Sequence, residues 1–251
     1  MFFNNDEMEI DLNCDLGEGG KSDTLIMPLI SSCNIACGGH YGNEKSIAET
    51  LDLAAEYKVN IGAHPSYPDK KNFGRKPIDI SLKTLEESLI HQIQLLCQQA
   101  KKQKLRPKHV KPHGRLYHDL ISNQEKAEMF VSLVWEINPR FILFAPPKSR
   151  LLDAAKGKLK TWVEGFADRN YGKDFELISR ENSEALLTEK ELVFERIFSM
   201  LKEQKIPLKN GGFLRAKFDT FCIHSDTPNC VEILRFLNQK LPEKDIQISR
   251  I

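Results

Sequence analysis

Four histidines stand in short segments rich in glycine or proline, at widely separated positions of the 251-residue chain. They are His40 in Gly38-Gly39-His40, His64 in Gly62-Ala63-His64-Pro65, His113 in Lys111-Pro112-His113-Gly114, and His224 in Cys222-Ile223-His224-Ser225-Asp226. Imidazole exchanges protons near neutral pH and binds divalent metals, so four such residues at one pocket would serve acid–base or metal-assisted hydrolysis. One histidine of this kind is more often structural. The coincidence of four indicates a site.

Carboxylates accompany the histidines near the beginning of the chain. In the segment Asp11-Leu12-Asn13-Cys14-Asp15-Leu16-Gly17-Glu18, polar and apolar residues alternate. If this segment is a strand, Asp11, Asn13 and Asp15 share one face, where three polar groups are costly unless they meet partners or a ligand. We predict that Asp11, Asn13 and Glu18 bind substrate and that Asp15, with His64, positions or deprotonates water. Asp15 also fits the alternative of a helix N-cap, as does Asp226.

Basic residues and glycines extend the predicted site. Lys111 would neutralise developing negative charge together with His113, and Arg75 would hold a substrate carboxylate as a bidentate fork. The backbone amides of Gly38 and Gly39 would approach a ligand closely, although a tight turn is the alternative explanation. The predicted catalytic residues are therefore Asp15, His40, His64, Lys111 and His113. The predicted substrate-binding residues are Asp11, Asn13, Glu18, Gly38, Gly39, Arg75, His224 and Asp226.

Three of these side chains could also hold a divalent metal. Asp15, His64 and His113 supply a carboxylate and two imidazoles, a ligand set that leaves a position open for water. The spacing does not require a metal, because such a triad also works without one. Other polar residues are interpreted as structural: His91, His109 and His118, and the pair Asp168-Arg169, which standing alone would be a solvated ion pair.

Strand and helix patterns alternate along the chain and would position these residues. Strand-like runs occupy residues 9–14, 30–36, 59–63, 109–111, 141–145, 161–165 and 219–223. Helical patterns occupy residues 44–57, 188–204 and 229–239, and the clearest, with Ser81 as N-cap, places on one face Leu82, Leu85, Leu89, Ile93, Leu96 and Ala100. This alternation predicts an α/β fold, a distorted seven-stranded parallel β/α barrel, in which chemistry lies at the carboxyl ends of the strands. The polar stretch 165–184 is predicted to be a long loop or small excursion.

Composition limits the partners and the compartment. Lys and Arg total 36 and Asp and Glu total 35, and a net charge of +1 gives no field that would attract nucleic acid or an anionic membrane. No apolar run is long enough to span a bilayer, and residues 1–7 do not resemble a signal peptide. We therefore expect one domain over residues 1–251, a cytoplasmic location, and reduced thiols at the six cysteines, with a zinc site at Cys14, Cys33 and Cys37 as a lesser alternative.

Seven motifs, in order, resemble the LamB/YcsF family. Besides the opening segment 11–18 they are Asn34-Ile35-Ala36-Cys37-Gly38-Gly39-His40, Gly62-Ala63-His64-Pro65, Phe73-Gly74-Arg75, Val110-Lys111-Pro112-His113-Gly114, Phe166-Ala167-Asp168-Arg169 and Cys222-Ile223-His224-Ser225-Asp226. The resemblance covers about residues 9–241. The sequence departs from the family pattern in three places, which would lie at the rim of the pocket. The loop over residues 17–23 is shorter. Tyr41 replaces a small residue and Asn43 replaces Asp, and Ser225 replaces Gly.

The resemblance implies a barrel similar to that of metal-dependent polysaccharide deacetylases, and an activity. The activity is 5-oxoprolinase, which opens the cyclic amide of 5-oxoproline to L-glutamate as ATP becomes ADP and phosphate. In that family subunits B and C are also needed, so this chain would correspond to the A subunit. The sequence contains no Walker-type loop or dinucleotide fingerprint. This agrees with a reaction in which the partner subunits complete the use of ATP. The alternatives are a metal-dependent deacetylase or amidohydrolase acting alone, and a non-catalytic binding subunit.

Overall fold

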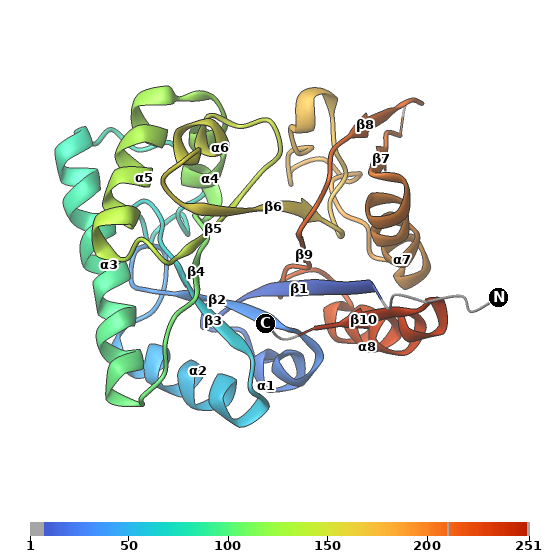
Figure 1. Cartoon of the computed structure of the whole chain (residues 1–251), viewed down its shortest axis with the longest axis horizontal. Coiled ribbons are helices and arrows are strands. Elements are labelled where there is room, and N and C mark those ends of the chain that lie inside the picture. The colour runs from blue at the N-terminus through green and yellow to red at the C-terminus, as the bar shows by residue number, and fades with distance from the viewer. Residues whose placement is uncertain (1–7, 210, 250–251) are drawn as a thin grey trace.

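Seven parallel strands close into a barrel in the computed structural model, which describes residues 8–209 and 211–249 (Figure 1). In barrel order they are β1 (Met8–Leu16), β2 (Ser32–Ala36), β3 (Asn60–His64), β4 (His109–Val110), β5 (Ile142–Ala145), β6 (Lys160–Phe166) and β9 (Thr220–Cys222). Pairing of β9 with both β6 and β1 closes the ring. All seven predicted strands are present, and the predicted fold class is confirmed.

The interior of the barrel is polar, and the alternation in β1 explains why. Leu12, Cys14 and Leu16 belong to the apolar cluster around the barrel. The alternate residues Asp11, Asn13 and Asp15 instead hydrogen-bond to side chains of neighbouring strands. Because side chains of a strand alternate between its two faces, one face of β1 serves the outer core and the other serves the interior. The polar residues that lead to the site are therefore part of the barrel.

Helices follow the strands and cover the outside of the barrel (Figure 1). They are α1 (Asp23–Ile26), α2 (Glu44–Tyr57), α3 (Leu82–Lys102), α4 (Gly114–Ser122), α5 (Gln124–Ile137), α6 (Arg150–Ala155), α7 (Lys190–Phe198) and α8 (Cys230–Lys240). Ser81 caps α3 through the Thr84 amide, as predicted, and Asn43 forms a capping box with Ser46 at α2. Asn43, which stands where the family usually has Asp, is therefore still a residue suited to an N-cap.

Several elements lie beyond the predicted pattern. β10 (Ile246–Ile248) pairs with the start of β1, and β7 (Lys205–Pro207) and β8 (Phe213–Arg215) form a separate antiparallel hairpin. The predicted helix 188–204 is α7 continued by a π-helical turn, Ser199–Glu203. After β6, the chain makes the excursion expected for residues 165–184, held by two isolated bridges and a 3-10 turn, Lys173–Phe175. Within the described ranges, no helix is long and apolar enough to cross a membrane.

Candidate active site

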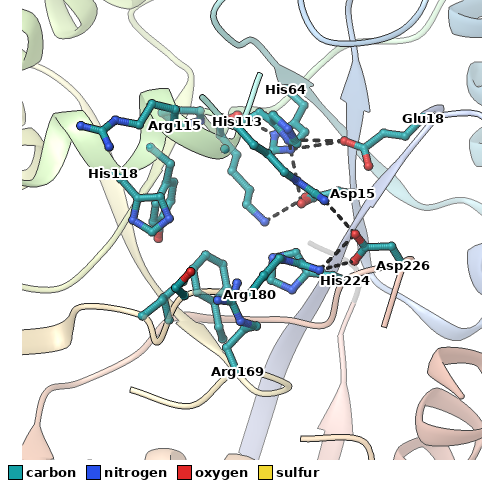
Figure 2. Close-up of a pocket in the computed structure, with 18 of the residues that line it drawn as sticks. Asp15, Glu18, His64, His113, Arg115, His118, Arg169, Arg180, His224 and Asp226 are labelled. Atoms are coloured by element: carbon teal, nitrogen blue, oxygen red, sulfur yellow. Dashed lines mark hydrogen bonds and ion pairs between the residues drawn. The ribbon is translucent and has the colours of Figure 1, made fainter. Parts of the chain in front are cut away.

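A pocket of about 440 Å³ opens at the carboxyl ends of the barrel strands (Figure 2). Eight of the thirteen predicted site residues line it: Asp15, Glu18, His64, Arg75, Lys111, His113, His224 and Asp226. They come from β1 and the segment after it, from the end of β3 and the segment after it, and from the segments after β4 and β9. The fold thus brings together side chains from four distant parts of the chain.

Two imidazoles face each other at the centre of the pocket wall. His64 Nε2 lies 2.9 Å from His113 Nδ1. The other nitrogens donate to backbone carbonyls, His64 Nδ1 to Lys111 at 2.8 Å and His113 Nε2 to Phe73 at 3.0 Å. Because a carbonyl only accepts, those nitrogens carry the hydrogens, and in neutral rings the facing nitrogens both present lone pairs. The arrangement therefore favours a proton or a metal cation between the rings.

Two carboxylates complete this centre. Asp15 Oδ2 lies 3.3 Å from His64 Nε2, and Glu18 Oε1 lies 3.4 Å from His113 Nδ1. Burial would raise the pKa of Asp15, but the charges of His64 and Lys111 hold it well below its usual range. Burial, with the charge of Asp15, raises the pKa of Glu18 to about 7. One carboxylate is thus a permanent anion, and the other exchanges a proton near neutral pH.

Lys111 lies beneath this centre and is almost completely buried. Its ammonium group contacts Asp15 Oδ1 and Glu164 Oε1, both at 2.9 Å, and Cys222 Sγ at 3.1 Å. Burial would lower the pKa of Lys111, but the charges of Asp15, Cys222 and Glu164 raise it well above its usual range. Lys111 is therefore a fixed cation that holds two buried carboxylates. Sequence reasoning missed Glu164, although a carboxylate in the apolar run 161–165 was a usable signal.

A second acid–imidazole pair stands across the pocket. Asp168 accepts hydrogen bonds from the His224 backbone amide at 2.8 Å and from Thr227 Oγ1 at 2.5 Å, and it lies 3.0 Å from His224 Nδ1. Burial would raise the pKa of Asp168, but the charge of His224 lowers it. Since Asp168 occupies Nδ1, the Nε2 atom of His224 is the nitrogen left for a ligand. A ring nitrogen of His224 also lies within 4.8 Å of an Asp15 carboxylate oxygen.

His40 lies behind the residues that line the pocket and is not one of them, so its catalytic role stays a prediction. Its ring stacks on His113 at 3.6 Å between centroids, and its Nε2 lies 2.7 Å from Glu18 Oε1. Burial lowers the pKa of His40 to about 3, so the ring is neutral. These two contacts restrict the plane of the His113 ring and the position of the Glu18 carboxylate.

Asp11 and Asn13 lie deeper in the barrel and also do not line the pocket, so their substrate-binding role stays a prediction. Asp11 accepts hydrogen bonds from Ser31, Ser32 and Thr220. Asn13 donates to Thr220 and accepts from Asn34 and Lys111. These polar groups are satisfied by one another, which removes the reason for assigning them to a ligand.

Gly38 and Gly39 form a tight turn, the alternative explanation, and do not line the pocket. The Gly38 amide donates to the Tyr41 carbonyl at 2.7 Å, with a φ of 106° that favours glycine. Gly39 packs against protein, because an added Cβ would clash with Gln92 Oε1 and with Ser66 Oγ. Glycine is needed at position 39 because the backbone there lies close to the Gln92 side chain of α3.

Replacing Gly39 by Ala is therefore expected to destabilise the fold by about 1–3 kcal/mol, because the new methyl group overpacks this contact. The midpoint of urea denaturation measures the effect. Gly172→Ala is the matched control, since its φ of −88° suits any residue and the nearest atom to an added Cβ there, the Glu176 carbonyl oxygen, lies at 3.7 Å. Unchanged stability of Gly39→Ala would contradict the packing explanation.

Two arginines share one carboxylate at the mouth of the pocket. Arg75 Nη2 lies 2.7 Å from Asp226 Oδ2, and Arg180 Nη1 lies 3.1 Å from both Asp226 oxygens. Arg75 was predicted, and Arg180 was missed because it lies in the excursion, whose path no pattern in the sequence defines. Asp226 uses one nitrogen of each guanidinium, so each keeps donors for a ligand.

Three further lining residues were missed or misassigned. His118 and Arg115 lie on α4, which was not predicted as an individual helix. Burial lowers the pKa of His118 to about 4. Arg169 also lines the pocket and does not form a solvated ion pair with Asp168: both are buried, and Arg169 donates to backbone carbonyls.

The fold and the site define a closed parallel β/α barrel with an acid–imidazole pocket at the carboxyl ends of its strands. The chain belongs to the LamB/YcsF family, whose sequence model matches residues 10–251. It is 35% identical over 250 residues to the A subunit of 5-oxoprolinase from Staphylococcus carnosus (strain TM300), covering 97% of this chain and 99% of that protein. The corresponding protein of Staphylococcus aureus (strain JH9) is 37% identical over 250 residues, covering 97% and 100%.

A solved structure is similar over the same length. The lactam utilization protein from Thermus thermophilus superposes with a TM-score of 0.89 at 32% identity, covering 97% of this chain and 100% of that one. The match to the family model, over residues 10–251, includes every segment that lines the pocket.

Proposed function

We propose that this chain is the A subunit of a cytoplasmic 5-oxoprolinase and hydrolyses the cyclic amide of 5-oxoproline to L-glutamate. The observation that carries the proposal is the convergence of Asp15, His64, His113 and His224 on one pocket. This convergence occurs in a chain that matches proteins named as the A subunit of 5-oxoprolinase over nearly their whole length. Six cysteines without disulfides agree with a reducing compartment.

ATP and partner subunits are part of the proposal. Resonance stabilises an unactivated lactam, so its opening needs coupling to an energy source. Phosphorylation of the amide oxygen by ATP would make the ring carbon electrophilic, with ADP released. Because the sequence has no Walker-type loop, we assign ATP binding to subunits B and C, or to a site that they complete.

The residues of the pocket suit the hydrolysis of such an activated lactam. Water adds its oxygen to the ring carbon and loses a proton to Asp15 or His64, while Lys111 keeps Asp15 ionised. His224 gives a proton to the ring nitrogen as the carbon–nitrogen bond breaks, which leaves an acyl phosphate. A second water releases phosphate and forms the new carboxylate. The sum is 5-oxoproline, ATP and two waters converted to glutamate, ADP and phosphate.

Reconstitution tests the function directly. Purified chain, the two partner proteins and ATP are incubated with 5-oxoproline, and glutamate and ADP are measured. Glutamate formed only in the complete mixture, with equal ADP, supports the proposal. Glutamate formed equally well without this chain would refute it.

The pair Asp168 and His224 predicts a specific kinetic defect. In Asp168→Asn the amide cannot hold the His224 ring as a carboxylate does, so we expect kcat to fall about 10–100-fold. KM for 5-oxoproline should change little, since Asp168 does not line the pocket. Steady-state kinetics of the reconstituted enzyme, with Asp174→Asn as control, separates the two constants. A rise in KM with unchanged kcat would contradict an acid role for His224.

A divalent metal also fits the centre. Ligand atoms of Asp15, His64 and His113 lie within 4.8 Å of one another, and the two facing imidazole nitrogens present lone pairs. A metal held there would supply Lewis-acid polarisation of the amide carbonyl. Added Zn²⁺ or Mn²⁺ is expected to raise the melting temperature of the wild type. His113→Ala should abolish this shift and exposed His91→Ala should keep it, while an equal shift in both variants would place the metal elsewhere.

The same lone pairs favour one second candidate, a metal-dependent amidohydrolase that acts alone. It requires turnover of an amide without ATP or partners. The reconstitution experiment distinguishes the two, because omission of ATP stops one reaction and leaves the other unaffected.

A further inference from the structure

The loop over residues 69–75 follows β3 and has an unusual backbone conformation. Phe73 has a φ of 54° and Gly74 a φ of 63°, so two consecutive residues lie in the left-handed region. Glycine adopts this region freely, whereas an aromatic residue there is strained. Such strain persists only where surrounding contacts enforce it, and it is concentrated at active sites. Specific contacts must therefore hold Phe73 in this conformation.

The aromatic ring of Phe73 supplies these contacts. It meets the imidazoles of His40 and His113 edge to face, with centroids 5.0 Å and 5.4 Å away and interplanar angles of 73° and 77°. The Tyr41 ring lies 6.4 Å from it, and the guanidinium carbon of Arg75 lies 4.9 Å from its centroid. Edge-to-face pairs and a cation over a ring add stability beyond simple burial. Together these contacts offset the cost of the left-handed backbone.

The loop is also fixed on the glycine side of Phe73. The Gly74 amide donates to the Asp69 carbonyl at 2.8 Å, and the Gly74 carbonyl accepts from the Arg115 amide at 2.9 Å. A Cβ added at Gly74 would lie 3.2 Å from His113 Cδ2, so the backbone packs directly on the imidazole. Because the chain after Phe73 has a fixed path, the conformation of Phe73 itself determines where its carbonyl points.

This carbonyl selects the tautomer of His113. It accepts from His113 Nε2 at 3.0 Å, which keeps the hydrogen on Nε2 and a lone pair on Nδ1. His113 Nδ1 is the atom that faces His64 Nε2 at 2.9 Å. Without the carbonyl, the hydrogen of His113 would move to Nδ1, because it could then be donated to the lone pair of His64. The lone pair that faces the pocket centre therefore depends on the carbonyl of Phe73.

We propose that Phe73 is a positioning residue for hydrolysis at the histidine centre. Its ring, packed against His40 and His113, holds its backbone in the left-handed region, and this backbone aims the carbonyl that keeps the His113 hydrogen on Nε2. The inference rests on the proposed function and adds to it a residue that does not line the pocket. Loss of the ring releases the backbone and lets the imidazole change tautomer.

Long-range proton–nitrogen correlation spectra of the imidazoles test the tautomer in the full-length chain alone. In mildly alkaline buffer with a chelator, His113 of the wild type should carry its hydrogen on Nε2. Phe73→Ala should move most of the His113 population to the form with hydrogen on Nδ1. Phe73→Asn also lacks the ring, but asparagine enters the left-handed region more readily than alanine, so it should keep more of the Nε2–H form. The same spectra verify that each variant is folded.

Kinetics of the reconstituted enzyme should follow the tautomer. For Phe73→Ala we expect kcat to fall about 10–100-fold, as for other residues that orient a catalytic imidazole, and Phe73→Asn should recover part of this loss. KM for 5-oxoproline should rise less than about threefold, because Asp226 still holds Arg75 at 2.7 Å. Phe236→Ala on α8 is the matched control, since it also removes a partly buried ring with a cation, Lys190, at 5.6 Å. It should change neither kcat nor the tautomer.

Two outcomes would overturn the proposal. One is a His113 hydrogen that stays on Nε2 in Phe73→Ala. The other is a Phe73→Asn protein that resembles Phe73→Ala in both tautomer and kcat, because the ring alone and not the backbone would then explain the loss. The spectra require no turnover, so they remain valid if the wild type with its partners and ATP forms no glutamate. That separate result would count against the proposed function.

Discussion

An Asp15→Asn protein is expected to lose turnover by about 10²–10⁴-fold while remaining folded. Asp15 is the carboxylate that both Lys111 and His64 hold ionised, at 2.9 Å and 3.3 Å, and it faces the pocket. Asparagine keeps an oxygen that can accept from Lys111 and Asn34, so the hydrogen bonds of the barrel interior persist. Only the negative charge and the capacity to accept a proton are removed.

The measurement is glutamate formation by the reconstituted enzyme, with circular dichroism melting to verify the fold. Exposed Asp52→Asn on α2 is the matched control and should behave as wild type. His113→Ala is expected to have a comparable effect, because it removes the ring that faces His64 at 2.9 Å. Turnover near the wild-type value in both Asp15→Asn and His113→Ala would remove the catalytic assignment.

A Lys111→Met protein is expected to lose about 3–5 kcal/mol of stability together with its activity. Lys111 is the cation shared by Asp15 and Glu164, and Glu164 is 1% exposed. Its removal leaves two buried carboxylates without their counter-charge. Urea denaturation at pH 7 measures the loss. In the double variant Lys111→Met with Glu164→Gln, part of the stability should return while turnover stays low.

The loss of stability in Lys111→Met is also expected to depend on pH in a defined direction. In the wild type, His64 and Lys111 lower the pKa of Asp15 in the folded protein. The ionised Asp15 therefore stabilises the fold fully above the pKa of an unfolded Asp, about 3.9, and this contribution is lost as the pH falls through the folded pKa. Without Lys111, Asp15 takes up a proton at a higher pH, which removes the cost of burying its charge without that partner. The deficit of Lys111→Met should therefore shrink on acidification, and a deficit that grows as pH falls would contradict the ion-pair explanation.

The seven barrel strands could be predicted from the sequence because each is a short apolar or alternating run bounded by polar residues. The strand-end rule then placed eight predicted residues at the pocket. The rule failed for Asp11 and Asn13, since a polar strand face can point into a barrel interior as well as toward a ligand. It failed for His40 because the Gly38-Gly39 turn carries the ring behind His113.

Other residues of the site could not be predicted from the sequence, for a different reason. Arg169 and Arg180 reach the pocket only because the excursion folds back over it, held by contacts such as Arg169 to the Ile178 carbonyl. Irregular segments have no periodicity from which such a path can be inferred. Glu164 meets Lys111 only after the sheet has closed, so its role depends on a pairing between strands that local sequence does not encode.

The hydrogen bond from Thr220 to Asp11 joins residues 209 positions apart and lies at the seam where β9 meets β1. A ribosome must therefore release almost the entire polypeptide before this ring can form. Until then the charged inner faces of the early strands remain open to water, and contacts of such long sequence separation are slow to form. Nascent chains that stall before residue 220 should be unable to assemble the pocket and should depend on chaperones to avoid aggregation.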